Sequence, residues 1–382
     1  MQTTLLGGLT ATQFLRRHWQ KQARLIRQAL PDFAGILSRK ELYALAARDD
    51  VESRLVIRRA GRGRAGWSLE RGPFRAADFR GLPASGWTLL VQGVDLHVDA
   101  AADLIAGFNF VPYARLDDLM ISYAVPEGGV GPHFDSYDVF LLQGPGRRRW
   151  RTSTQRDLEL TPGVPLKILR RFRPENDWIL EPGDMLYVPP DVAHDGIAVT
   201  ECMTYSIGFR APAADELVEQ FLQFLPDALG KPAVRYADPD LPATRSPGRI
   251  DLRLQRRLGS MLKTIRWDRA MVDRFIGCVL SEPKPTVFLD PPENPLRRSE
   301  FAARIARSGT GGVRLDRRAR MLYDSMNVYL DGAVVAPVAE HPLLATLADR
   351  RRLPPDSRWT KAVLDTLFDA YLCGALHVGE KT

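Results

Sequence analysis

Apolar and polar residues recur along this chain with two different periods, and the change between them predicts its elements. Residues 14–30 place apolar side chains at imperfect helical spacing, and a second helical stretch follows at 38–47. From about residue 54 the pattern changes to short strands separated by glycine and proline. The predicted strands lie within 53–59, 87–96, 118–125, 137–144, 147–153, 178–189 and 201–209. Many short strands with turn residues between them indicate a β-sandwich or β-barrel.

The pattern changes again after Pro212. Residues 214–281 carry helical periodicity and predict a helical bundle or a dimerisation element. Five prolines within 281–295 mark a boundary. Beyond it, a helix, a hairpin turning at Asp331-Gly332 and one or two further helices predict a small α+β unit of winged-helix type. We therefore expect a strand-rich domain at 1–212, a helical dimerisation region at 213–290 and a winged-helix-like domain at 291–382.

Composition limits the classes of protein to consider. With 45% apolar and 26% charged residues in 382, the sequence is typical of a globular protein with a substantial core. Its three cysteines are widely spaced, which excludes a disulfide framework or a zinc finger and favours a reducing, cytoplasmic compartment. No stretch reaches membrane-spanning length, so we expect no membrane association. The formal charge of +7 would suit an acidic partner such as RNA, although it equally describes an ordinary basic surface.

The stretch GPHFDSYDVF, residues 131–140, pairs an imidazole with a carboxylate inside an apolar run. If the run is a strand, His133, Asp135 and Tyr137 share one face. A histidine and a carboxylate on one face provide two ligands of the 2-His-1-carboxylate triad that binds Fe(II) and leaves positions open for substrate and oxygen. Among six histidines, His194 is the natural third ligand. We expect it on a loop, after the double proline of EPGDMLYVPPDVAHDG. Alone, a His-x-Asp pair arises easily by chance.

Two neighbouring strands add polar groups to the same interior. Alternation places Asp118, Met120 and Ser122 on one face of their strand. In GRRRWRTS, alternation places Arg148 and Trp150 on one face of the strand, which we expect to face the barrel interior. The other three arginines then face solvent. A buried arginine needs a carboxylate or phosphate, from the protein or from a ligand. The alternative reading is that all four arginines form a basic surface patch.

Two longer stretches carry a specific resemblance. RLDDLMISYAVPEGGVGPHFDSYDVFLLQGPGRRRW (115–150) and LEPGDMLYVPPDVAHDGIAVTECMTYSIGFRAP (180–212) closely resemble the JmjC-type ribosomal oxygenases. The nearest subgroup hydroxylates an arginine of large-subunit ribosomal protein sixteen. The match covers roughly residues 1–212, including HWQK, SRLV and GPF, and is weaker beyond. Ala23 departs from the proline that the family pattern leads us to expect.

The resemblance implies a fold and a chemistry. The fold is α+β: a double-stranded β-helix (jelly-roll or cupin) barrel with N-terminal helices, a helical dimerisation region and a winged-helix-like unit. His133, Asp135 and His194 would hold Fe(II), and Arg148, with Ser122, would bind the cosubstrate 2-oxoglutarate, O2 being the other reactant. For an arginine substrate, Asp118 would bind the guanidinium and Tyr137 and Met120 would flank its methylene stem. The partners implied are a ribosomal protein and a second copy of the chain, without direct binding to nucleic acid.

Several alternatives remain at this point. The same barrel and triad occur in histidine hydroxylases and lysine demethylases, so the acceptor residue is less defined than the reaction class. A non-catalytic regulator, with a ligand-sensing barrel and a DNA-binding winged helix, would not need the full set of three ligands and Arg148. A zinc-bound cupin isomerase or hydrolase would not need an inward Arg148 either.

Overall fold

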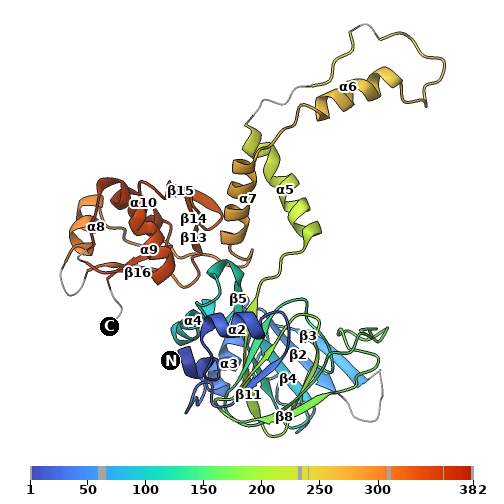
Figure 1. Ribbon diagram of the computed structural model, residues 1–382, viewed down its shortest axis with the longest axis vertical. Helices are drawn as coiled ribbons and strands as arrows, with labels where there is room; N and C mark the ends of the chain where they lie inside the picture. The colour runs from blue at the N-terminus through green and yellow to red at the C-terminus, as the bar shows by residue number, and fades with distance from the viewer. Residues whose placement is uncertain are drawn as a thin grey trace. The chain divides into compact units, whose positions relative to one another are not determined.

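The structure is a computed structural model that describes residues 2–58, 66–230, 235–239, 241–307, 311–355 and 357–379 of the chain. These residues form two compact units (Figure 1). The first comprises Met1–Ala211, Lys284–Leu289 and Asp316–Arg318, and the second comprises Pro212–Pro283, Asp290–Leu315 and Ala319–Thr382. The division of the chain into three domains stays a prediction. Arg59, which ends the first predicted strand, lies outside the described residues.

The first unit is rich in antiparallel strands. Its strands are β1 (Arg24–Ile26), β2 (Ser53–Arg58), β3 (Trp67–Arg71), β4 (Trp87–Val91), β5 (Leu116–Ala124), β6 (Val139–Gln143), β7 (Arg148–Ser153), β8 (Asn176–Leu180), β9 (Met185–Val188), β10 (Ala193–Ala198) and β11 (Cys202–Phe209). Eight of them form one sheet in the order β1-β9-β6-β11-β5-β4-β2-β3, and three form a second sheet in the order β10-β7-β8. Two antiparallel sheets of this kind are the expected barrel architecture.

Strand alternation decides which residues face the barrel interior. On β5, Leu119, Ile121 and Tyr123 are buried in the main apolar core. The opposite face carries Ser122, which the antiparallel register places directly across from Thr204 on β11. A smaller apolar cluster, lying between the two sheets, contains Val139, Leu141, Trp150, Leu180, Leu186, Val188 and Val192. The predicted alternation of β5 is therefore confirmed.

Short helices cover the outer face of the large sheet (Figure 1). They are α1 (Gln2–Leu5), α2 (Ala11–Arg17), α3 (Arg39–Ala46) and α4 (Asp99–Ala106). Phe14, Leu42 and Ala101, one from each of the last three, are fully buried in the main core with the sheet residues. This layer fixes the large sheet from outside and leaves its inner face for the polar side chains.

The helix predicted over residues 14–30 is wrong in its length. A capping box of Thr10 and Gln13 starts α2, which ends at Arg17. The chain then reverses through Gln20, whose φ is 55°, and continues as β1, paired with β9 at the edge of the large sheet. Leu25 and Ile26 fall within the predicted helix, but in the structure they belong to β1. Pairing with β9 overrides a weak helical pattern here.

The second unit holds the remaining elements. They are α5 (Ala214–Leu229), α6 (Leu252–Leu262), α7 (Arg269–Ser281), α8 (Arg298–Ile305), β12 (Val313–Leu315), β13 (Met321–Tyr323), β14 (Asn327–Leu330), β15 (Ala333–Pro337), α9 (Pro342–Arg350), β16 (Arg352–Leu353), α10 (Lys361–Leu372) and β17 (Leu376–Val378). The strands form two sheets, β16-β12-β17 and β13-β14-β15. Asp331 and Gly332 both have positive φ and turn β14 into β15, as predicted for an Asp-Gly hairpin.

Aromatic side chains hold α5 and α7 together within this unit. Phe221 and Phe224 of α5 contact Phe275 of α7 at ring-centroid distances of 5.1 and 5.5 Å.

Among the residues that the structure describes, no helix has both the length and the apolar content that a bilayer span requires.

Candidate metal centre

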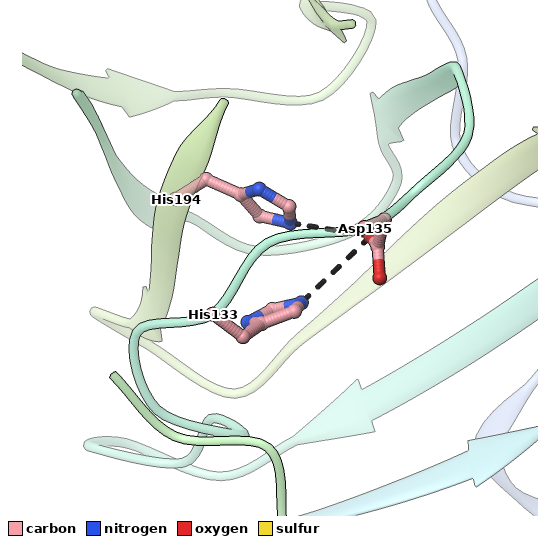
Figure 2. A group of neighbouring side chains, drawn as sticks. All are labelled: His133, Asp135 and His194. Atoms are coloured by element: carbon pink, nitrogen blue, oxygen red, sulfur yellow. Dashed lines mark ion pairs between the residues drawn. The ribbon is translucent and has the colours of Figure 1, made fainter. Parts of the chain in front are cut away.

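Three side chains from two distant segments converge inside the barrel (Figure 2). His133, Asp135 and His194 each offer one ligand atom, and these atoms all lie within 4.8 Å of one another. The Oδ2 atom of Asp135 is 3.9 Å from Nε2 of His133 and 3.6 Å from Nε2 of His194. Two imidazole nitrogens and one carboxylate oxygen at such spacing form a three-ligand face for one metal ion.

The local structure of the first two ligands differs from the prediction. His133 and Asp135 do not lie on a strand, because β6 begins only at Val139. His133 instead forms an isolated antiparallel bridge with His194: each backbone N–H donates to the other residue's carbonyl, at 2.9 and 2.8 Å. His194, expected on a loop, lies on β10. The bridge therefore fixes both imidazoles through the backbone, and Asp135 reaches them from the loop that follows.

Hydrogen bonds set the tautomers of both histidines. Nδ1 of His133 lies 2.8 Å from the carbonyl oxygen of Gly131, and Nδ1 of His194 lies 2.9 Å from that of Val192. A carbonyl oxygen can only accept, so each Nδ1 carries the proton and donates. Each Nε2 then presents its lone pair toward Asp135, the arrangement in which a neutral imidazole binds a metal.

Burial keeps His194 in the form that a ligand needs. Its side chain is almost fully buried, and this desolvation, together with the neighbouring His133, lowers the pKa of His194 below its usual value. The imidazole is thus neutral at pH 7 and free to bind a cation. Two imidazoles and a single carboxylate suit a divalent ion with mixed nitrogen and oxygen preference, such as iron.

Arg148 is buried without a matching anion. It is 3% exposed on β7, and its Nη1 donates to the hydroxyls of Ser122 (2.8 Å) and Thr204 (3.2 Å). Its Nε has no partner, and no carboxylate of the described residues lies within ion-pair distance. Burial consequently lowers the pKa of Arg148. A guanidinium in this state favours an added carboxylate, which can accept two of its N–H groups at once.

Trp150 lies between Arg148 and His194. Its ring centroid is 6.0 Å from that of His194, and the Arg148 guanidinium carbon is 5.4 Å from the ring. The register places Trp150 opposite Gly196 on β10, where an added Cβ would meet the indole at 2.6 Å. Glycine at 196 therefore makes room for the ring. The inward orientation predicted for Arg148 and Trp150 agrees with their burial.

The three predicted substrate residues lie on β5 and just before β6. Asp118 is 3% exposed and accepts a hydrogen bond from the backbone N–H of Gly93 at 3.1 Å. Met120 follows on the same face of β5, and Tyr137 precedes β6 with 39% exposure. Desolvation, and then the charges of Asp135 and Asp118, raise the pKa of the Tyr137 phenol. Tyr137 is therefore near both carboxylates. The roles of these three residues in substrate binding stay predictions.

Sequence reasoning missed the support of the Asp135 loop. Asp138 is completely buried and accepts hydrogen bonds from the Tyr187 hydroxyl (2.5 Å) and from Nε2 of Gln20 (3.0 Å). Nη2 of Arg115 lies 3.5 Å away. Nothing in the sequence indicates the partners of Asp138, because they come from the N-terminal segment and from β9. Thr204, whose hydroxyl is the second partner of Arg148, belongs to no motif that would single it out in the sequence.

Comparison with known proteins agrees with this geometry. The matching family models are a JmjC domain, over residues 103–217, and a ROXA-like winged helix, over residues 264–377. The chain is 35% identical over 368 residues to the ribosomal protein uL16 3-hydroxylase of Escherichia coli, covering 96% of this chain and 95% of that protein. Human ribosomal oxygenase 1 is 28% identical over 204 residues, which are 50% of this chain and 31% of that one.

The similarity extends to solved structures. YcfD, a ribosomal oxygenase from Escherichia coli in complex with cobalt and 2-oxoglutarate, superposes with a TM-score of 0.77 at 32% identity. The match covers 97% of this chain and 98% of that one. These similarities confirm the predicted fold class, with a JmjC barrel and a winged-helix-like unit.

Proposed function

Because the chain belongs to the JmjC-domain ribosomal oxygenases, we propose that it is an Fe(II)- and 2-oxoglutarate-dependent hydroxylase of an arginine side chain in a large-subunit ribosomal protein. Its nearly full-length match to a protein named uL16 3-hydroxylase supports uL16 as the substrate. A ribosomal substrate is also consistent with a cytoplasmic enzyme.

The residues of the metal centre have distinct roles in this proposal. His133, Asp135 and His194 would hold the iron on one face, and Arg148 would bind the distal carboxylate of 2-oxoglutarate, with Ser122 and Thr204 orienting its guanidinium. When bound, iron and 2-oxoglutarate supply the activation of O2, with succinate and carbon dioxide as coproducts. The single observation that carries the assignment is Arg148, a buried guanidinium with two hydroxyl partners and no protein anion beside the three-ligand face.

The side of the site next to Asp118 favours a cationic substrate. Asp117 and Asp118 are adjacent on β5, and Asp118 is almost fully buried. A buried carboxylate attracts an arginine or lysine side chain and discriminates against a neutral one. A guanidinium can donate two parallel hydrogen bonds to a carboxylate, which a lysine cannot. Met120 and Tyr137 would flank the methylene stem, so the acceptor is a carbon of an arginine side chain.

The test is anaerobic loading of the protein with Fe(II) and 2-oxoglutarate, followed by O2 and peptides from ribosomal proteins. Succinate and peptide mass are measured together. We expect succinate and one added oxygen atom on an arginine of a uL16 peptide, and neither product with the His133→Ala variant.

Matched peptides make the acceptor explicit. Replacement of the modified arginine by citrulline, which has the same shape without the charge, should abolish oxidation. Oxidation at histidine would reject arginine as the substrate and keep the oxygenase. Intact iron binding without succinate formation would reject the oxygenase assignment.

A further inference from the structure

A lysine of the chain itself contacts the carboxylate that we assign to the substrate. Nζ of Lys284 lies 3.1 Å from Oδ2 of Asp118 and 3.3 Å from Oδ1 of Asp117. Lys284 follows α7 in the sequence, yet it belongs to the same compact unit as the barrel. Its side chain is 34% exposed, while that of Asp118 is 4% exposed. The ammonium therefore covers a buried carboxylate from the solvent side.

Lys284 is the main counter-ion of this carboxylate. Arg210 is a second cation of the group, but its Nε lies 3.5 Å from Asp117. A further buried carboxyl, Asp95, accepts from the backbone N–H of Leu119, and burial followed by the charge of Asp118 raises the pKa of Asp95 to about 7. Burial raises the pKa of Asp118, and Lys284 opposes this effect more than any other group. Without a cation at this position, Asp118 would hold an uncompensated charge.

Asp118 lies on the same face of β5 as the residue that binds Arg148. Gly208 of β11 lies across from Asp118, and an added Cβ there would be in van der Waals contact, at 3.8 Å, with the Asp118 carboxylate oxygen Oδ1. Met120 is the next residue on the same face of β5 after Asp118, and Ser122, which accepts a hydrogen bond from Arg148, is the one after that. Asp118 is thus one end of a row that leads to the cosubstrate site.

We propose that Lys284 is an internal competitor, which occupies Asp118 in the absence of substrate and is displaced by the substrate guanidinium. This inference rests on the proposed function. A lysine ammonium at a partly exposed site is a single, flexible point charge that returns to water at small cost. An arginine substrate replaces it with two parallel hydrogen bonds, whereas a lysine substrate makes no contact that Lys284 does not already make. The competitor would therefore select arginine over lysine.

Two substitutions with opposite expected effects test the proposal. In Lys284→Met the competitor is removed, and we expect the KM for the arginine peptide to fall about fivefold, as expected for loss of one charge pair whose lysine is partly exposed. In Lys284→Arg the competitor gains the guanidinium geometry, and the KM should rise by a similar factor. The kcat should change little in both. Lys361→Met, which removes one exposed positive charge from α10, is the control for net charge.

A role of Lys284 in stability alone predicts a different pattern. Lys284→Arg would then keep the KM of the wild type, and Lys284→Met would not lower the KM. Either result overturns the proposal. A lower melting temperature of Lys284→Met does not discriminate, because Asp118 loses its counter-ion in both cases.

Reductive methylation of the wild-type holoenzyme gives a second readout that needs no variant. Displacement should increase the labelling of Lys284 when the arginine peptide is added, and the citrulline peptide should leave it unchanged. Unchanged or lower labelling with the arginine peptide overturns the inference. If the wild type oxidises no arginine peptide, the proposed function fails and the inference fails with it. If the wild type oxidises the arginine peptide and neither Lys284 variant changes the KM, only the inference is rejected.

Discussion

At the scale of single residues, Arg148 is the side chain whose environment is least satisfied. Its guanidinium has hydroxyl partners only, and its Nε has none. Burying a charge without an opposite charge costs several kcal/mol, and the bound cosubstrate would remove this cost. The empty protein is therefore less stable than the same protein with a dicarboxylate bound.

Arg148→Met should separate stability from cosubstrate binding. Removal of the uncompensated charge should raise the melting temperature of the metal-free protein by about 2–4 °C for each kcal/mol gained. Ser122 and Thr204 keep other acceptors, the Thr204 carbonyl and the Gln143 side chain, at 3.5 and 3.2 Å. The increase in melting temperature that 2-oxoglutarate causes in the wild type should disappear. Differential scanning fluorimetry with and without 2-oxoglutarate measures both effects.

The neighbouring arginine provides the control. Arg149 lies on the opposite face of β7 and forms an exposed ion pair with Asp177, which contributes little to stability. Arg149→Met should leave both the stability and the response to 2-oxoglutarate nearly unchanged. A lower melting temperature for Arg148→Met, with the response to 2-oxoglutarate intact, would contradict the role of Arg148.

At the scale of elements, the loop between the His133 bridge and β6 depends on Asp138. Its carboxylate receives hydrogen bonds from Tyr187 of β9 and from Gln20, just before β1. The backbone N–H of Gln20 also donates to the Tyr187 hydroxyl at 2.8 Å. One buried carboxylate thus connects the ligand-bearing loop to two other segments.

Asp138→Asn should weaken metal binding as well as folding. The amide cannot accept at both of its ends, so a buried donor loses its partner at a cost of about 1–3 kcal/mol. We also expect the affinity for Co(II), titrated by absorbance, to fall about tenfold or more, as is typical when a group that orients ligands is changed. Tyr187→Phe is the milder companion, because Gln20 still donates to Asp138. Unchanged Co(II) affinity in folded Asp138→Asn protein would limit Asp138 to a structural role.

The sequence predicts the interior of the barrel better than its connections. Alternation alone places Ser122 and Arg148 inward, because a strand has only two faces. It fails around His133, where Gly131 and Pro132 interrupt the strand and the single bridge to His194 is a long-range pairing. Likewise, β1 exists because β9 is its partner, which periodicity near residue 25 cannot reveal. The contact of Lys284 with Asp118 could not be predicted from the sequence either, because a proline-rich linker gives no sign of where it packs.

At the scale of the whole molecule, the helical region leaves apolar side chains uncovered. Val218 and Leu222 on α5 are 60% and 59% exposed, and Leu258 and Leu262 on α6 are 41% and 69% exposed. Exposed apolar residues of this kind often mark a protein interface. They support the prediction that this region forms a homodimer, which remains untested.

Leu222→Glu is the variant that tests the dimer. A charge in an apolar interface between two copies costs several kcal/mol, so we expect light scattering to give twice the chain mass of 42.8 kDa for the wild type and the single mass for the variant. Gln223→Glu adds the same charge at the next exposed position and should remain dimeric. A monomeric wild type would disprove the prediction.

The hydrogen bond between Gln20 and Tyr187 joins residues 167 positions apart, and it has a consequence for synthesis. Chains grow at about 5–20 residues per second, so the N-terminal segment waits roughly 8–33 s after emerging before its partner strand exists. During that interval β1 has an unpaired backbone edge, and Asp138, once it has been made, has no Tyr187 to bind. The active centre can therefore be completed only near the end of barrel translation, and until then the unpaired edge of β1 is open to pairing with another chain.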